Sequence, residues 1–233
     1  MNFLHTGHIG DIIAFLPTMK AMGGGNLIIR NHNDHWAPMK GFRFDSVKPL
    51  LESQSYIGSV EYQDHPKNID YDASQFRHLH NNRDCLLDIQ AKHAGVEPCY
   101  DKWLDVEPDS KMKGRVIIAR SPRYNNDRFP HRFLARKLGG RAVFVGTPHE
   151  HTEYEATIGR TIHHHKTGNL LDLAKAIAGC HLFIGNQSSP CWLAMGLHAR
   201  LIQEVCDYTP DAQVPYDGAR YVQSGKVLDE WID

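Results

Sequence analysis

The feature that most constrains the fold is a regular alternation of short apolar runs and helix-like segments between residues 115 and 205. The segments GRVIIARS, RAVFVGT, HLFIGN and ARLIQEV each contain an apolar run of the length of a buried strand. Helix-like segments separate them, among them FPHRFLARKLGG, PHEHTEYEATIG, NLLDLAKAIAGC and SPCWLAMGL. Strands that alternate with helices are typical of a parallel sheet covered by helices. The sequence therefore predicts an α/β fold with mostly parallel sheets.

The residues before 96 contain a similar set of elements. A strand ends near Leu4, a helix follows over IGDIIAFLPTMKAM, and a second strand is expected at 27–29. A further helix, a strand near Val60, a loop over IDYDASQFRHL and a helix ending at Gly95 complete the set. We expect Pro17 in the second turn of the first helix, where proline costs little. Residues 96–114 contain prolines and charges with little periodicity, which is typical of a linker or an edge segment.

Two sets of elements predict two Rossmann-like domains, residues 1–105 and 106–233, with mostly parallel sheets facing a central cleft. Ligands of open parallel sheets bind beyond the carboxyl ends of the strands. The turns after Leu4, Ala119 and Ile184 are therefore the expected site.

Composition narrows the class of protein. Lys and Arg total 26 against 27 Asp and Glu, so there is no basic excess of the kind that nucleic-acid binding by bulk charge requires. No apolar run approaches the roughly 20 residues of a membrane span, and the N-terminus lacks a signal-peptide pattern.

Five cysteines without a CxxC pair favour reduced thiols and a cytoplasmic location. We interpret His163–His165 as a solvated loop or strand end rather than a metal site, because adjacent strand residues point to opposite faces.

The first turn, HTGHIGD, brings Gly7, His8 and Gly10 to the start of a helix, followed by Asp11. Glycine allows a ligand close to the backbone, and a helix N-terminus offers free amides. The spacing is not that of a dinucleotide-binding GxGxxG motif. Asp11 has two interpretations: an acid that complements the helix dipole, or a general base at the end of a strand.

The second turn, RSPRYNNDRFP, is rich in arginine. Guanidinium groups bind phosphate oxygens at two points, which suits a diphosphate, although a surface loop also carries arginines. The candidate ligand contacts here are Arg120, Ser121, Arg123 and Arg128. Glu150, early in the next helix, could accept from ribose hydroxyls or complement the helix dipole.

The third turn interrupts the segment FIGNQSSPCWLAMGL. Asn186, Gln187, Ser188 and Ser189 stand between two buried segments, and Pro190 is suited to the first turn of the next helix. A capping serine accounts for one of these polar residues. The group as a whole predicts an anion site made of helix amides and hydroxyls.

In this order, GDIIAFLPTMKAM, VFVGTPHE and NLLDLAKAIAGCHLFIGNQSSPCWLAMGL resemble the motifs of the heptosyltransferase-like glycosyltransferases, family 9 of the GT-B fold. The resemblance covers about the first 20 residues and much of 115–205. It implies a GT-B-like fold in which Asp11 is the catalytic base, Glu150 holds the ribose and Ser188 belongs to the turn that binds the donor phosphate. Arg128 falls beside the family's basic residue, at whose own position this chain has Asp127.

The chain departs from the family at three places in the third turn. Gln187 stands where the family has Asp, Ser189 where it has Gly, and Trp192 where it has His. We expect these differences to alter the donor pocket.

The function predicted from these features is transfer of a sugar from a nucleotide-sugar donor to an acceptor hydroxyl. Helix amides together with arginines can hold a diphosphate without a metal, so we expect neither a metal nor a cofactor, with the nucleotide sugar as co-substrate. The acceptor stays open between a saccharide, a small metabolite and a modified nucleobase. Two alternatives remain: a non-catalytic nucleotide-sugar-binding module of the same fold, and an unrelated Rossmann-like nucleotide enzyme.

Overall fold

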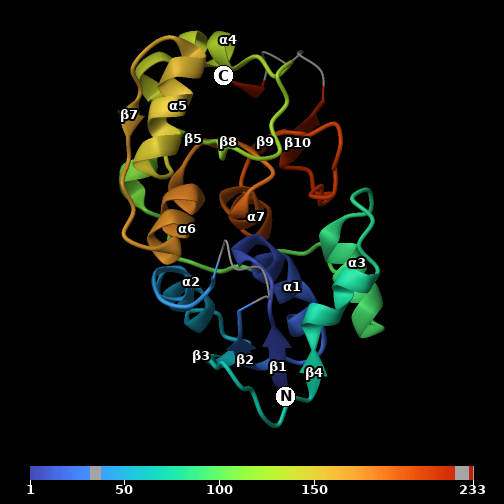
Figure 1. Ribbon diagram of the computed structural model, residues 1–233. Coiled ribbons are helices and arrows are strands. Elements are labelled where there is room, and N and C mark those ends of the chain that lie inside the picture. Colours follow the sequence, from blue (N-terminus) through green and yellow to red (C-terminus); the bar gives the residue numbers. More distant parts are fainter. Residues whose placement is uncertain (32–37, 224–230, 233) are drawn as a thin grey trace.

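The protein consists of two parallel sheets with helices between and beside them (Figure 1). The computed structural model describes residues 1–31, 38–223 and 231–232. The first sheet lies near the N-terminus, and the second lies at the other end of the molecule with the C-terminus beyond it. The α/β fold with parallel sheets that the sequence predicts is confirmed.

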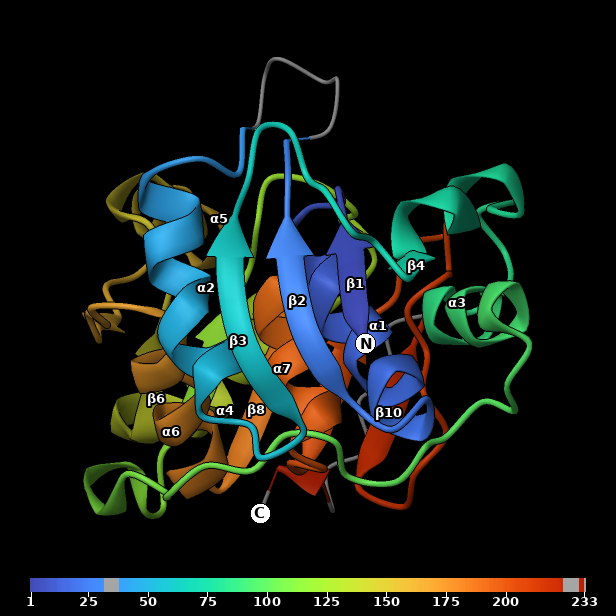
Figure 2. The ribbon, with the colours of Figure 1, turned by 90° about the horizontal axis from the view of Figure 1, so that it is seen from below.

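The first sheet has the strand order β3-β2-β1-β4, and its strands pair in parallel (Figure 2). Its strands are β1 (Asn2–His5), β2 (Gly25–Ile29), β3 (Ile57–Tyr62) and β4 (Tyr71–Asp72). The short β4 and the 3-10 helix η1 (Ala73–His78) occupy a segment that we predicted as a loop. That prediction was wrong because β4 gains its ladder from β1, a tertiary contact that local sequence does not reveal.

The second sheet has the strand order β10-β9-β8-β5-β6-β7, also paired in parallel. Its strands are β5 (Val116–Ala119), β6 (Ala142–Phe144), β7 (His163–His164), β8 (Leu182–Asn186), β9 (Leu201–Glu204) and β10 (Ala219–Val222). The two sheets thus come from residues on either side of 105, whereas the domain boundary itself stays a prediction.

The α-helices of the first half are α1 (Ile9–Ala21), α2 (Phe42–Glu52) and α3 (Leu86–Ala94). Those of the second half are α4 (His131–Leu138), α5 (Pro148–Ile158), α6 (Leu170–Gly179) and α7 (Ser189–Gly196). The short 3-10 helices η2 (Ser110–Met112) and η3 (Gly139–Arg141) precede β5 and β6.

Local sequence signals set several helix ends. Gly95 ends α3 in the left-handed conformation at φ 69°, as a C-terminal glycine can without strain. Asn169 caps α6 by accepting from the Asp172 N–H. Pro17, by contrast, lies eight residues after the start of α1 at Ile9, not in its second turn. The prediction was wrong because burial of residues 12–19 outweighs the local cost of proline.

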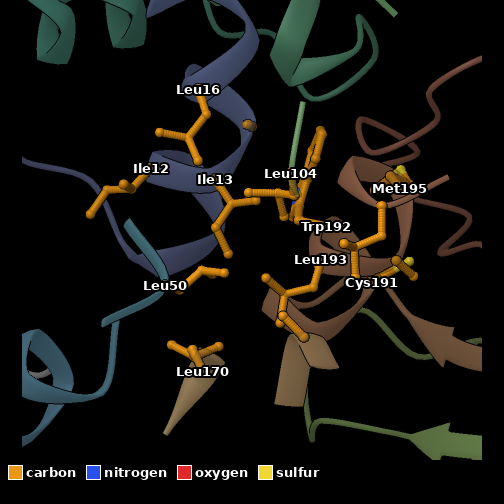
Figure 3. Close-up of a cluster of buried hydrophobic side chains, with 14 of the residues drawn as sticks. Ile12, Ile13, Leu16, Leu50, Leu104, Leu170, Cys191, Trp192, Leu193 and Met195 are labelled. Carbon is orange, nitrogen blue, oxygen red and sulfur yellow. The ribbon is translucent and has the colours of Figure 1, made fainter. Parts of the chain in front are cut away.

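The main hydrophobic core joins the two halves. Helix α1 contacts α7, and α2 contacts α6. Figure 3 shows side chains from both halves meeting in this cluster. The labelled members are Ile12, Ile13, Leu16, Leu50, Leu104, Leu170, Cys191, Trp192, Leu193 and Met195. A separate core, on the other face of the second sheet, packs α4 and α5 against β5, β6 and β8.

The segment predicted as a linker also takes part in this core. Trp103 and Leu104 are buried, and their backbone N–H groups donate to the carbonyl of Gly196 at 3.1 and 2.9 Å. A side chain on Gly196 would collide with both residues. The connection between the halves is therefore tied to the end of α7.

Candidate functional site

The first turn places Asp11 in the first turn of α1. Its Oδ2 atom accepts from the His8 backbone N–H at 3.0 Å and from Arg77 Nη2 at 2.8 Å. A Cβ on Gly7 would lie 2.5 Å from His5 Cε1 and 2.6 Å from Asp11 Cβ, so only glycine fits there. The lack of a side chain at Gly7 thus leaves room for His5 and Asp11, and an approach of a ligand to this glycine stays a prediction. Asp11 is partly exposed and part of a compact polar cluster.

Two buried side chains, His5 of β1 and Gln90 of α3, support this turn. Gln90 Nε2 donates to the Asp11 carbonyl at 2.9 Å, and Gln90 Oε1 lies 3.4 Å from His5 Nε2. His5 Nδ1 accepts from the Gly7 N–H at 2.9 Å, which assigns the ring proton to Nε2. Complete burial lowers the pKa of His5 to about 4, against the opposing effect of Asp11, so the ring is neutral at pH 7.

Charged residues from other parts of the chain act on His8 of the first turn. Burial lowers the pKa of His8 against the effect of Asp11, and the guanidinium groups of Arg123, Arg77 and Arg43 lower it further. Arg123 comes from the loop after β5, so the first and second turns lie near each other. Gly10 faces α7: a Cβ there would lie 3.2 Å from Cδ1 of Trp192.

In the second turn, Arg120 is held by a buried carboxylate. Glu204, fully buried at the carboxyl end of β9, accepts from Arg120 Nε and Nη2 at 3.1 and 3.2 Å. It also accepts from the Asn126 N–H at 2.6 Å and pairs with His131 Nε2 at 3.1 Å. Burial would raise the pKa of Glu204, but the bonds from His131 and Arg120 outweigh it and hold the pKa below its usual value. The charge of Arg120 is therefore largely compensated within the protein.

Asn186 joins the second and third turns. Its fully buried side chain accepts from the Ser121 N–H at 3.1 Å and donates to the carbonyls of Ser121 and Arg123 and to Asn125 Oδ1. These bonds fix the loop that carries Arg123. In the same loop Tyr124 has a φ of 58°, a strained value for a bulky residue. The structure thus gives Asn186 a role in loop positioning.

The remaining polar residues of the third turn either hold the 206–211 segment or cap helix α7. Gln187 is buried, accepts from the Cys206 N–H at 2.7 Å, and donates to the Thr209 carbonyl and to Asp211 Oδ1. Ser188 is the N-cap of α7, and its hydroxyl donates to the Asn186 carbonyl at 3.2 Å. Ser188 and Ser189 are partly exposed, whereas the Gln187 side chain faces the 206–211 segment.

Glu150 caps its own helix and lines a pocket. Its Oε2 accepts from the Thr147 N–H at 2.7 Å, and its N–H donates to Thr147 Oγ1 at 3.2 Å, forming a capping box. A pocket of about 320 Å³ lies between the β5 loop and α5. Its lining residues are Arg120, Ser121, Pro122, Asn125, Glu150, Glu153, Tyr154, Ala156 and Thr157.

The predicted site residues therefore fall into three groups. Arg120, Ser121 and Glu150 share the pocket. Gly7, His8, Gly10 and Asp11 form the first turn, with Arg123 near His8. Arg128 stands apart, as a largely exposed guanidinium paired with Asp207.

The sequence does not reveal the partners that hold these residues, chiefly Arg77, Gln90, His131 and Glu204. Their polar identity gave no signal, because each acts on a residue far away along the chain. Arg77 lies 66 residues from Asp11, and Glu204 lies 84 residues from Arg120.

The described residues contain neither a metal-binding cluster nor a membrane-spanning helix. Within 1–31, 38–223 and 231–232, no three His, Cys, Asp or Glu side chains cluster as metal ligands would. In the same ranges, none of the helices combines the length and apolarity that crossing a bilayer requires.

Comparison of the sequence found no matching family model and no matching curated protein. Solved structures do match. One is a glycosyl transferase of family 9 from Veillonella parvula, 13% identical, with a TM-score of 0.62 over 95% of this chain and 84% of that chain. Another is the E. coli heptosyltransferase WaaC with ADP, 11% identical, with a TM-score of 0.65 over 94% and 92%.

A third match is the dodecameric iron-containing heptosyltransferase TibC from enterotoxigenic E. coli, in complex with ADP-D-beta-D-heptose. It is 14% identical, with a TM-score of 0.62 over 100% of this chain and 64% of that chain. At these identities the likeness establishes the fold. The GT-B-like fold that the motifs imply is confirmed, and with it the resemblance to family 9 structures.

Proposed function

We propose that this chain is a glycosyltransferase that moves a sugar from a nucleotide-sugar donor to an acceptor hydroxyl, with Asp11 as general base and without a metal. The observation that carries the proposal is the position of Asp11. Its carboxylate follows a central strand of the first sheet, on a fold whose solved examples include family 9 transferases. Parallel sheets bind ligands at this end of their strands.

The hydrogen bonds of Asp11 support a role in proton transfer. Both bonds to its carboxylate, from His8 and from Arg77, fall on Oδ2. In this proposal the other oxygen, Oδ1, accepts the proton of the acceptor hydroxyl. As that proton leaves, the acceptor oxygen bonds to the anomeric carbon of the donor, and the bond from this carbon to the diphosphate oxygen breaks.

The departing diphosphate carries negative charge, which Arg123 and the first amides of α7 would stabilise. Arg123 supports this assignment because its charge reaches His8 in the first turn. Arg120 and Arg128 are each paired with a carboxylate, so we expect them to contribute less to stabilising the diphosphate. Ser188 and Ser189 would contact the phosphates, while Asn186 and Gln187 would act by holding the neighbouring segments.

The proposal is tested first by binding. Calorimetric titration with ADP, UDP and GDP, each with and without EDTA, should give binding by at least one nucleotide that EDTA does not change. Absence of binding by all three would remove the proposal. Loss of binding or of transfer in EDTA would instead show that a metal is required.

The role of Asp11 is tested by Asp11→Asn. This variant should keep its nucleotide affinity and lose transfer by about 10²–10⁴-fold, because only the proton acceptor is removed. Asp172→Asn is the matched control, since Asp172 is also a first-turn helix acid but is exposed on α6. Wild-type turnover by Asp11→Asn would exclude it as the base.

A second candidate is a non-catalytic module that binds nucleotide sugars. The departures at Gln187 and Trp192 favour it, because both side chains are buried inside the protein where the family has an Asp and a His. Incubation with a panel of nucleotide sugars, followed by mass spectrometry, separates the two functions. A module would bind without donor hydrolysis or transfer, and transfer to any acceptor would exclude it.

A further inference from the structure

Two tyrosines outside the pocket form an exposed aromatic pair. Tyr124, in the loop after β5, and Tyr208, in the segment after β9, have ring centroids 6.3 Å apart and planes inclined by 38°. Tyr208 is 69% exposed, and the guanidinium of Arg123 lies 5.2 Å from the centroid of the Tyr124 ring. Neither tyrosine lines the pocket between the β5 loop and α5. We call these two rings and the guanidinium the aromatic platform.

The backbone of Tyr124 is held in a conformation that bulky residues rarely adopt, with a φ of 58°. The buried side chain of Asn186 enforces it, because it donates to the carbonyl of Arg123 and to Asn125 Oδ1, one residue on either side of Tyr124. Strained backbone of this kind persists only where the surrounding structure fixes it, and it is concentrated at functional sites. The strain therefore indicates that the position of this ring has a use.

The second ring is fixed by the next residue of the third turn. Gln187 accepts from the Cys206 N–H at 2.7 Å and donates to the Thr209 carbonyl, so it holds the chain on both sides of Tyr208. Two consecutive buried residues, Asn186 and Gln187, thus each fix one segment of the aromatic platform.

The aromatic platform lies at the junction of the two halves, near the first turn. In the 206–211 segment, Asp211 Oδ2 lies 3.0 Å from His80 Nε2, and the Asp211 carbonyl accepts from the Leu86 N–H at 2.8 Å. Both partners belong to the first half. Burial lowers the pKa of His8, and the guanidinium of Arg123 lowers it further, so the other segment also reaches the first half.

The chemistry of the aromatic platform suits a sugar ring. The face of an aromatic ring is electron-rich, and the C–H bonds on one face of a pyranose present partial positive charge to it. The polar tips of tyrosine and arginine can bond the hydroxyls at the edge of the sugar. A nucleic-acid backbone fits less well, because Asp207 and Asp211 flank Tyr208 in the chain and the protein has no basic excess.

We propose that the aromatic platform binds the acceptor, and that this acceptor is a saccharide whose ring stacks on Tyr208 and Tyr124. Asp11 then takes the proton from one of its hydroxyls. The inference rests on the proposed function, because it takes the ligand of the platform to be the acceptor of the transfer.

Saturation-transfer NMR tests saccharide binding without requiring transfer. The probes are glucose, galactose, N-acetylglucosamine and lactose, each with and without ADP. The wild type should bind at least one of them. Tyr208→Ala should raise its Kd by about 3- to 10-fold, because a stacked ring is lost. Its thermal midpoint should stay within about 2 °C of the wild type, because the side chain is exposed.

Three further variants separate the ring from other effects. Tyr208→Phe keeps the ring and should keep most of the affinity. Tyr124→Asn removes the second ring with a residue that tolerates a positive φ, and it should weaken binding as Tyr208→Ala does. Phe133→Ala is the matched control, since Phe133 is a 41% exposed aromatic residue on α4, a helix that packs on the other face of the second sheet. It should leave the saccharide Kd unchanged.

Two results would overturn the inference and leave the proposed function intact. One is that none of the four saccharides binds, including the case in which adenosine or thymidine binds in their place and depends on Tyr208. The other is that Tyr208→Ala and Tyr124→Asn both bind the saccharide as tightly as the wild type. The proposed function fails separately, when calorimetry shows no nucleotide binding, and a saccharide held by the platform is then not an acceptor.

Discussion

At the scale of single residues, His5 gives a prediction about pH. Its pKa is about 4 in the folded protein and 6.5 in an unfolded chain, because the folded state buries the ring completely. Between these values the unfolded state binds the proton and the folded state does not, so stability falls as pH decreases. From pH 7 to pH 4 we expect this histidine to remove roughly 3 kcal/mol from the free energy of unfolding.

Denaturant titrations across this pH range measure the loss, and His5→Asn provides the comparison. Asparagine does not titrate, and its side-chain oxygen can still accept from the Gly7 N–H, as His5 Nδ1 does. The variant is expected to be less stable overall but to show a shallower dependence on pH than the wild type. Equal slopes for the two proteins would mean that His5 does not carry the effect.

At the scale of elements, the alternation of apolar runs and helical segments was sufficient to predict the strand-to-helix turns. The turns after β1, β5 and β8 fall where the sequence predicts them, because strand length and helix periodicity are local properties. The hydrogen-bond partners of the residues in each turn could not be predicted. Glu204 looks like a surface acid at the end of a strand, and only the parallel pairing of β9 with β8, itself paired with β5, brings it to Arg120.

The 206–211 segment after β9 depends on Gln187, which gives a prediction for this element. In Gln187→Glu an oxygen replaces the amide nitrogen that donates to the Thr209 carbonyl and to Asp211. Two acceptors then face the new carboxylate in a buried place. We expect a loss of roughly 3–5 kcal/mol in unfolding free energy, the cost of an uncompensated buried charge.

A double-mutant cycle identifies the cause of this loss. In the Gln187→Glu background, Asp211→Asn offers an amide donor to the new carboxylate and removes one negative charge. The double variant should recover part of the stability, relative to the sum of the two single effects. Additive losses would show that the contact between residues 187 and 211 does not decide the stability of the segment.

At the scale of the whole molecule, the two halves are joined by a core rather than by a linker alone. Trp192 is 4% exposed and belongs to the cluster that contains Ile13 and Leu16 of α1 (Figure 3). It contacts the first turn of α1, where a Cβ on Gly10 would be tightly placed. The sequence suggested that Trp192 alters the donor pocket, whereas its side chain lies in the core that the halves share.

This shared core predicts that the protein unfolds in one cooperative step. Trp192→Ala should lower the stability by about 3–5 kcal/mol and also loosen the coupling between the halves, since the cavity opens at their junction. Calorimetry should therefore give a single transition for the wild type and a broadened or divided transition for the variant. Phe144→Ala is the control, because Phe144 is fully buried in the core on the other face of the second sheet. It should lower the midpoint and leave one transition, and a single sharp transition in Trp192→Ala would place the coupling elsewhere in the interface.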